Sequence, residues 1–298
     1  KHSGSLFGVG FNVSYYPNKI YINDIEQNIN KNEYNFEQEN NIVELIWDNN
    51  NIYNCRNMFR SNINMTEIDL NNFDISKVTS LWCMFREYYS LTSLNFTKWD
   101  TSKIKQMNGL FMDCKSLTSI NLSNFYTPIA NKMDSLFNGS IKLEYINIQN
   151  FDASTYQVYK YSFDNISENV VVCIKNESKN DKLLNQLKSE KCFNIDCSDD
   201  WRLNQKKLII GTDNCIESCS NDNQYKYEYQ GKCYDNCLIN DDNKYLNICK
   251  CELEQCLLCQ NEAATWKGLC TKCNYNYYPK ENDSFNIGEY INCYKEIK

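Results

Sequence analysis

The chain has 298 residues, a formal net charge of −7, and 38 acidic against 31 basic side chains. Because binding to phosphates needs a basic face, this balance argues against nucleic acid as a partner. No apolar run approaches the ~18 residues that a membrane helix needs, so we expect no membrane span within the chain. The chain begins Lys1-His2 without a methionine, and we interpret it as processed or excerpted.

The only histidine of the chain is His2. This scarcity removes Ser-His-Asp and Cys-His nucleophile arrangements, as well as histidine-based metal sites. Gly8-Val9-Gly10 lacks the third glycine and the following helix of a dinucleotide loop, so we interpret it as part of a strand. We therefore expect no catalytic residue, no cofactor and no metal, and a protein that is not an enzyme.

Residues 1–41 are expected to form an N-terminal strand and cap. Apolar side chains alternate with small or polar ones from Phe7 to Tyr16, which predicts a strand with one apolar face. Repeat proteins need covered ends, because strand edges and apolar faces are otherwise exposed. This strand would either pack at the edge of its own molecule or be donated to a neighbouring molecule, which would build a chain of subunits.

A 26-residue period organises residues 42–174. Four series of apolar residues keep this step in one register, which chance does not readily produce. The first series is the expected structural core: Phe59, Phe85, Phe111, Phe137 and Phe163. A second series marks the expected strands: Ile68, Leu94, Ile120, Ile146 and Val172.

Each unit is expected to contain one strand and one short helix. Residues 91–96 end in an apolar–polar alternation, as a half-buried strand does, and residues 100–103 suit a helix start. Helical spacing follows in four apolar residues: Ile104, Met107, Leu110 and Phe111. Such a unit cannot bury its apolar face alone, so we expect stacked units with parallel strands. The predicted fold class is α/β, a parallel solenoid.

Three aspartates recur in one register after the strands: Asp74, Asp100 and Asp152. A row of acid/base groups is one interpretation. Their position fits helix capping better, and the row breaks at Tyr126. We therefore expect a structural role for them.

Two successive units carry a family resemblance. One reads Met84-Phe85…Ser90-Leu91-Thr92-Ser93-Leu94-Asn95-Phe96…Trp99-Asp100-Thr101-Ser102-Lys103-Ile104, and the next runs from Leu110-Phe111 to Asn124-Phe125. These repeats resemble the BspA-type leucine-rich repeat family over about residues 42–174. The resemblance implies an αβ solenoid of surface proteins from bacteria and protists, often linked to adhesion, and it implies no reaction. Departures at Tyr126-Thr127-Pro128 and Tyr161-Ser162-Phe163 predict less regular geometry there.

Residues 175–214 are expected to be a C-terminal cap and linker. Residues 170–174 read as a last strand. Leu183, Leu184 and Leu187 then predict a capping helix within residues 181–191. This helix would cover the apolar face that the last repeat leaves open.

Residues 215–298 are expected to be a cysteine-rich disulfide module. Fourteen cysteines follow the third repeat cysteine at a density typical of oxidised extracellular modules, and all are disulfide candidates. They are Cys173, Cys192, Cys197, Cys215, Cys219, Cys233, Cys237, Cys249, Cys251, Cys256, Cys259, Cys270, Cys273 and Cys293. Two C-x2-C pairs, Cys256/Cys259 and Cys270/Cys273, could instead form a zinc ribbon. We favour disulfides, because an oxidising lumen joins thiols before a metal captures them.

The cysteine spacing after residue 215 resembles furin-like or growth-factor-receptor-type cysteine-rich modules. The resemblance implies a ladder of short loops held by disulfides. By the interleaved pattern of those modules, Cys215 would pair with Cys233 and Cys219 with Cys237.

Three further cysteines lie among the repeats: Cys55, Cys83 and Cys114. They occupy three different register positions, so they form no ladder. Cys55 aligns with Leu81 and Met107, which favours a small buried hydrophobic side chain.

Eight Asn-x-Ser/Thr sequons favour N-linked glycans and the secretory route, although so Asn-rich a chain produces several by chance. They begin at Asn12, Asn64, Asn95, Asn121, Asn138, Asn165, Asn176 and Asn282. Asn95 and Asn121 occupy one place in successive strands, where two glycans would stand ~5 Å apart and crowd the sheet face. The alternative is that one or neither is occupied.

Together the cysteines, the sequons and the resemblance predict an extracellular or cell-surface protein. We expect an adhesion or binding module whose partner is a protein or glycan surface ligand. The alternative is a glycosylated structural subunit of an extracellular filament or coat, in which copies of the chain join by strand donation or end-to-end contacts. A zinc-dependent module is the third interpretation, and it would require metal in stoichiometric amount.

Overall fold

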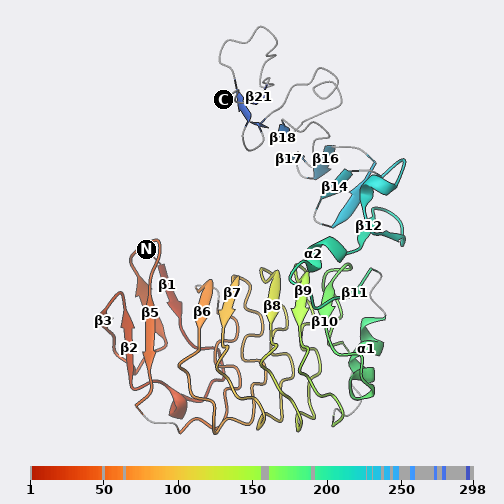
Figure 1. Ribbon diagram of the computed structural model, residues 1–298. Coiled ribbons are helices and arrows are strands. Elements are labelled where there is room, and N and C mark those ends of the chain that lie inside the picture. The colour runs from red at the N-terminus through yellow and green to blue at the C-terminus, as the bar shows by residue number, and fades with distance from the viewer. Residues whose placement is uncertain are drawn as a thin grey trace. The chain divides into compact units, whose positions relative to one another are not determined.

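The computed structural model divides the chain into two compact units, Lys1–Asn204 and Gln205–Lys298 (Figure 1). The boundary falls within the predicted cap and linker. The described residues are 2–48, 51–62, 65–155, 161–188, 192–225, 227–229, 231–235, 238–241, 244–247, 256–258, 272–273, 277–279 and 293–295. The fold is mixed α/β, with mostly small sheets and few helices. None of the helices in the described ranges is long and apolar enough to cross a membrane.

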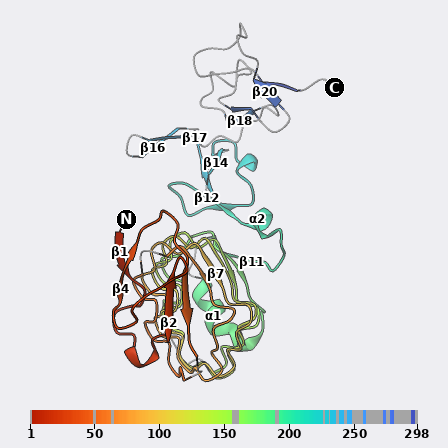
Figure 2. The ribbon, with the colours of Figure 1, turned by 90° about the vertical axis from the view of Figure 1, so that its left-hand side faces the viewer.

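The N-terminal part of the first unit forms two small antiparallel sheets, which lie at one end of the stacked coils (Figure 2). One sheet pairs β1 with β4, and the other has the order β3-β2-β5. Their bounds are β1 His2–Ser5, β2 Lys19–Ile22, β3 Ile25–Glu26, β4 Glu33–Phe36 and β5 Val43–Ile46. Alternate residues of β2 and β4 are buried, which explains why both segments are strands: Ile20, Ile22, Tyr34 and Phe36.

The prediction of a strand from Phe7 to Tyr16 is wrong. The segment turns at Gly10, where φ is +85°, and then forms the 3-10 helix η1, Val13–Tyr15. Phe7 and Phe11 are buried, whereas Val9 is 86% exposed. The alternating apolar residues therefore do not share one face. Two of them anchor an irregular cap instead.

Five three-residue strands follow the 26-residue period (Figure 1). Their bounds are β6 Glu67–Asp69, β7 Ser93–Asn95, β8 Ser119–Asn121, β9 Tyr145–Asn147 and β10 Val171–Cys173. The paired strands are parallel and in register, as Ile68 with Leu94 and Ile120 with Ile146 show. β6 and β7 form one sheet, and β8, β9 and β10 continue into β11, Asn194–Ile195. Neighbours within each sheet of repeat strands are thus one 26-residue coil apart.

A second row of parallel pairing runs along the other side of the coils. Isolated bridges join Asn54 to Ser80, Ser80 to Gln106 and Gln106 to Lys132. These residues are again 26 positions apart. The stacking is therefore fixed on two sides of each coil.

The prediction of a short helix in each repeat is wrong, because the residues at helical spacing lie in turns. Two positions per coil have a left-handed backbone conformation. The first is occupied by Asn57, Cys83, Gly109, Ser135 and Tyr161, and the second by Ser61, Glu87, Asp113, Gly139 and Asn165. A right-handed helix excludes such residues. The backbone N–H of Phe85 donates to the carbonyl of Leu110 in the next coil at 3.1 Å, not to a carbonyl four residues before it.

Two aromatic stacks run through the core of the first unit. The five phenylalanines Phe59, Phe85, Phe111, Phe137 and Phe163 are buried, and their successive ring centroids are 5.8, 5.6, 5.9 and 5.8 Å apart. Phe7 extends this stack from the N-terminal cap, 6.3 Å from Phe59. The second stack contains Trp47, Phe73, Trp99, Phe125 and Phe151. Offset ring pairs stabilise the core beyond the burial of their area.

The C-terminal end of the first unit is covered by helix α1, Asp181–Leu187, which follows the 3-10 helix η2, Ser178–Asn180. Leu183, Leu184 and Leu187 are buried on it, as the pattern predicts. A second short helix, α2, spans Trp201–Asn204.

The described residues of the second unit form one four-stranded sheet of order β13-β12-β15-β14 and three two-stranded sheets. The bounds of the larger sheet are β12 Lys207–Ile209, β13 Cys215–Ile216, β14 Tyr227–Tyr229 and β15 Lys232–Tyr234, with the 3-10 helix η3 at Cys219–Asn221. The two-stranded sheets pair β16 Leu238–Asp241 with β17 Lys244–Asn247, β18 Cys256–Leu258 with β19 Lys272–Cys273, and β20 Tyr277–Pro279 with β21 Cys293–Lys295.

Candidate binding surface

The outward face of the repeat strands is the first candidate surface. In each three-residue strand the central side chain points into the core, and the two flanking side chains point outward. The outward pairs are Glu67/Asp69, Ser93/Asn95, Ser119/Asn121 and Tyr145/Asn147. These residues are exposed in β6, β7 and β8 and partly buried in β9. The open face is therefore acidic at β6 and uncharged at β7 and β8.

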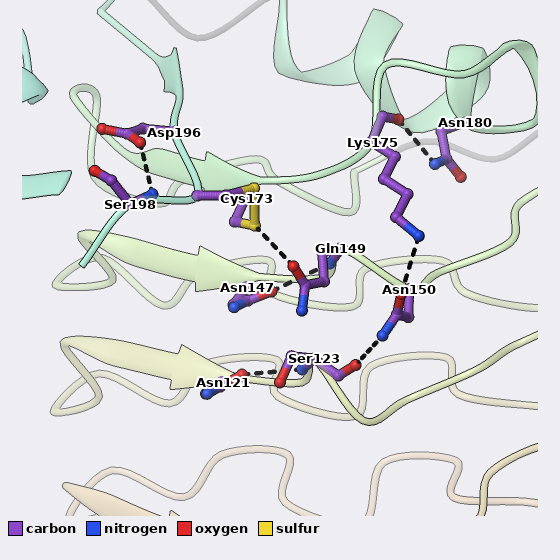
Figure 3. Close-up of a disulfide and its surroundings, with 11 residues drawn as sticks. Asn121, Ser123, Asn147, Gln149, Asn150, Cys173, Lys175, Asn180, Asp196 and Ser198 are labelled. Atoms are coloured by element: carbon purple, nitrogen blue, oxygen red, sulfur yellow. Dashed lines mark hydrogen bonds between the residues drawn. A yellow bond between two sulfur atoms is a disulfide. The ribbon is translucent and has the colours of Figure 1, made fainter. Parts of the chain in front are cut away.

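The C-terminal end of this face is covered. Tyr145 stacks on Trp201 of α2, with ring centroids 4.7 Å apart and an interplanar angle of 13°. Cys173 occupies the next position of the outward column after Asn147 and forms a disulfide with Cys197 (Figure 3). The segment after β11 is thus fixed against the strands, and the open part of the face ends before β9.

Asparagine side chains accept hydrogen bonds from the backbone just after the strands end. The Oδ1 atom of Asn121 accepts the N–H of Ser123 at 3.0 Å, and Oδ1 of Asn147 accepts the N–H of Gln149 at 3.2 Å (Figure 3). The nitrogen of Asn121, the atom that would carry a glycan, lies outside this bond.

The sequons differ in exposure. Asn12, Asn95, Asn121, Asn165 and Asn176 are exposed, Asn138 is partly buried, and Asn64 and Asn282 lie outside the described residues. The hydroxyl of Ser140, in the sequon of Asn138, is buried and donates to the carbonyl of Phe111 at 2.7 Å. Asn95 and Asn121 belong to different sheets, so they are not paired in one strand ladder.

The three aspartates in register stabilise turns by accepting backbone hydrogen bonds. The prediction that they cap helices is wrong, because no helix follows them. Asp100 Oδ1 accepts the N–H of Ser102 at 3.0 Å, Asp152 Oδ1 accepts that of Ser154 at 3.0 Å, and Asp74 forms the same bond. The hydrogen bond from the backbone of Ser102 lowers the pKa of Asp100. The carboxylate of Asp100 therefore stabilises its turn in the charged form.

The disulfide of Cys219 with Cys233 corrects the pairing implied by the furin-like resemblance. That resemblance implied Cys215–Cys233 and Cys219–Cys237. Cys219 opens η3, which packs against β15, and β15 carries Cys233, so these two cysteines meet. Cys192 takes part in a disulfide, and so does Cys215.

The other cysteines of the second unit are not described in full. Cys256, Cys273 and Cys293 lie in strands whose side chains are not described, and five more lie outside the described residues: Cys237, Cys249, Cys251, Cys259 and Cys270. The zinc interpretation of the two C-x2-C pairs therefore stays open. Within the described part of the chain, no group of three or more His, Cys, Asp or Glu side chains could hold a metal ion.

The three repeat cysteines are free and buried. Burial raises the pKa of the Cys114 thiol to about 12 and also raises the pKa of Cys55 and Cys83. A thiol with a raised pKa is protonated at neutral pH and is a poor nucleophile. Cys55 and Cys114 therefore pack as small apolar groups in the core, whereas the thiol of Cys83 interacts with Arg86.

A cleft between β5 and β6 is the second candidate surface. Its volume of about 690 Å³ lies within the ~300–1,000 Å³ range of ligand pockets. Its lining contains six carboxylates and no lysine or arginine: Asp24, Glu44, Asp48, Glu67, Asp69 and Asp74. No catalytic or metal-binding motif in the sequence indicates this site. An alignment of β6 with the later strands would have revealed Glu67 and Asp69, because serine and asparagine stand at these positions in β7 and β8.

Residues 18–95 and 88–201 match a family model described as "Mycoplasma protein of unknown function, DUF285". The two matches together cover more than half of the 298 residues. The chain belongs to the DUF285 family. The matched part of this DUF285 chain begins just before β2 and ends at Trp201, so it includes the β3-β2-β5 sheet and α1 as well as the repeats. No curated protein and no solved structure matches the DUF285 chain.

The family match leaves the two resemblances as predictions. Its description names neither a leucine-rich repeat nor a function. The matched residues end before the predicted cysteine-rich module.

Proposed function

We propose that this DUF285 chain is an extracellular or cell-surface protein that acts as a non-enzymatic adhesion or binding module. In this proposal residues 42–174 are a leucine-rich-repeat-like solenoid of the BspA type, and residues 215–298 are a furin-like disulfide-rich spacer or cap. The parallel strands in 26-residue register and the two aromatic stacks support the solenoid. The disulfides support an oxidising location.

The open strand face is the observation that carries the binding role. Ser93, Asn95, Ser119 and Asn121 are exposed on three-residue strands whose centres are anchored in one core. Because the core fixes the backbone that carries these side chains, binding costs little backbone conformational entropy. Their hydroxyl and amide groups both donate and accept hydrogen bonds, as a protein or glycan surface ligand requires.

A substitution on this face tests the proposal. Ser93→Arg/Ser119→Arg places two long charged side chains on the face without touching the core. We expect binding of the purified protein to host-cell or matrix surfaces to fall at least about tenfold, since a buried unpaired charge is costly in an interface. The matched control is Asn35→Arg/Asn40→Arg, at two exposed residues of the N-terminal part. Equal binding by both variants would contradict a role of the strand face.

A filament or coat subunit is the second candidate function. Val9 and Val13 are 86% and 72% exposed in the N-terminal cap, which supports end-to-end contacts between copies. Phe7 and Phe11, in contrast, are buried in their own molecule, which gives strand donation no support. Negative-stain images should show fibres that Val9→Asp/Val13→Asp abolishes and that Ile141→Asp, at an exposed apolar residue among the repeats, does not. Discrete particles under all conditions would reject this candidate.

The proposed location has its own test. Peptide mapping without reduction of the protein from its natural source should recover the Cys219–Cys233 link and identify N-linked glycans at Asn165 or Asn176, two exposed sequons outside the strand face. Reduced Cys219 in freshly quenched protein would contradict an oxidising location.

A further inference from the structure

Two unpaired strand edges line the acidic cleft. β5 is hydrogen-bonded to β2 and β6 to β7. Across the described residues, no backbone hydrogen bond joins β5 to β6. A strand in repeat register would span residues 41–43, but β5 spans Val43–Ile46 and follows the antiparallel register of β2, which breaks the ladder at this point. Unpaired edges are a template for an added strand.

The floor of the cleft is apolar and held in place. Ile52, Phe59 and Leu70 are buried in the core and also line the cleft. Trp47 packs edge-on against Phe73 with ring centroids 4.9 Å apart. The indole nitrogen of Trp47 also donates to the carbonyl of Tyr15 at 2.9 Å, which fixes this part of the wall. An apolar side chain can therefore enter a preformed pocket.

The rim of the cleft carries negative charge that the rest of the strand face lacks. Glu67 and Asp69 flank the centre of β6, and Glu44 lies on β5 opposite them across the cleft. Glu44 and Glu67 form no ion pair with a described residue. Uncompensated carboxylates around a cleft attract a cationic ligand.

We propose that this cleft binds an extended, basic peptide segment of a partner protein, which adds as a strand at the edges of β5 and β6. Alternate side chains of a strand point to opposite sides. Apolar residues of the peptide therefore enter the floor, and the lysines or arginines between them meet the carboxylates of the rim. The inference deepens the proposed binding role and rests on it, but it does not require the open strand face.

A synthetic octapeptide of alternating valine and lysine is the probe, and fluorescence anisotropy of its labelled form measures binding to the full chain. We expect Glu67→Gln/Asp69→Asn to weaken binding about tenfold at low salt, because two rim charges are lost. Glu44→Gln on the opposite strand should weaken it several-fold. The matched control, Asp199→Asn/Asp200→Asn, removes two exposed charges outside the cleft and should change binding less than twofold.

A second peptide tests the strand edges separately from charge. The same octapeptide with alternate amide nitrogens methylated keeps its lysines but cannot donate along one edge, so its affinity should fall at least tenfold. Equal binding of both peptides, equal loss in the cleft and control variants, or no binding up to millimolar peptide would each overturn the inference. So would self-association of the chain through this cleft in place of peptide binding. A chain that adheres to surfaces but ignores the peptide would overturn this inference alone and leave the proposed function standing.

Discussion

Cys55, Cys83 and Cys114 stay free inside the repeats, whereas Cys219 and Cys233 are joined in the second unit. Both sets of cysteines are buried. In the repeats, Cys55 and Cys114 belong to one large apolar cluster that includes both aromatic stacks, and Cys83, next to Met84 of this cluster in the sequence, is also buried. In the second unit the described cluster consists of Ile209 and the two joined cysteines, with Ile216 and Tyr225 packed against it.

The difference indicates that the size of the apolar core determines whether a buried cysteine stays a free thiol or forms a disulfide. A coil that stacks on its neighbours buries enough apolar area to hold its shape, and a thiol then serves as one more apolar side chain. A small loop-rich unit buries much less, so cross-links that restrict its unfolded state matter more. The repeats should therefore depend on packing and the second unit on disulfides.

The largest effect should come from the middle of the first stack. Phe111 lies between Phe85 and Phe137, 5.6 and 5.9 Å from their rings. Phe111→Ala should lower the free energy of unfolding of the first unit by ~3–5 kcal/mol, measured by chemical denaturation. Tyr126→Ala, at a half-exposed aromatic residue, is the control and should stay within ~0.5 kcal/mol. Similar losses of unfolding free energy in both variants would contradict the claim that packing of the aromatic stack stabilises the repeats.

Loss of the Cys219–Cys233 link should rank second. The link closes a loop with a sequence separation of 14, so Cys219→Ala/Cys233→Ala should destabilise the second unit by ~3 kcal/mol. Calorimetry should show the transition of the second unit lowered and that of the repeats unchanged. A parallel shift of both transitions would mean that the two units do not differ in this way.

Substitution of a glycine in each unit tests how tightly the backbone is packed. Gly109 has φ +58°, and an added Cβ would lie 3.1 Å from Sγ of Cys83 in the preceding coil. Gly109→Ala should cost ~1–2 kcal/mol in denaturation experiments, from left-handed strain and the close contact. Gly211→Ala in the second unit has φ +74° but open space around the Cβ, so it isolates the strain. Equal costs would show that the coils are not tightly packed at Gly109.

The smallest expected effect is the pH-dependent contribution of Asp100 to stability. The hydrogen bond from Ser102 lowers the pKa of Asp100 in the folded state, so its contribution is present above the unfolded pKa and is lost as the pH falls through the folded pKa. Because the group is exposed and screened, Asp100→Asn should reduce stability by only a few tenths of a kcal/mol at pH 7, and the difference should vanish at about pH 2. Urea denaturation at both pH values measures it, with Glu39→Gln as an exposed control. A larger difference at the lower pH would contradict the assignment.

Much of the first unit could be predicted from its period. The residues Ile68, Leu94, Ile120, Ile146 and Val172 are the strand centres, and the buried leucines of α1 follow their pattern. The N-terminal cap was not predictable in the same way. Phe7 and Phe11 alternate as a strand would, but what places them is the open end of the Phe59 stack, a feature that exists only once the coils have formed.

The 26-residue repeat length, the residues that face the core and the excess of cysteine after the repeats could all be read from the sequence, because each follows from local spacing and composition. The tertiary structure was needed to show that the segment after each strand forms turns, with two left-handed residues per coil, and no helix. The N–H groups of this segment find their acceptors in the neighbouring coil, so no helix is needed to satisfy them. The cleft was decided in the same way, since it exists only because β5 follows the register of β2 and leaves the edge of β6 without a strand.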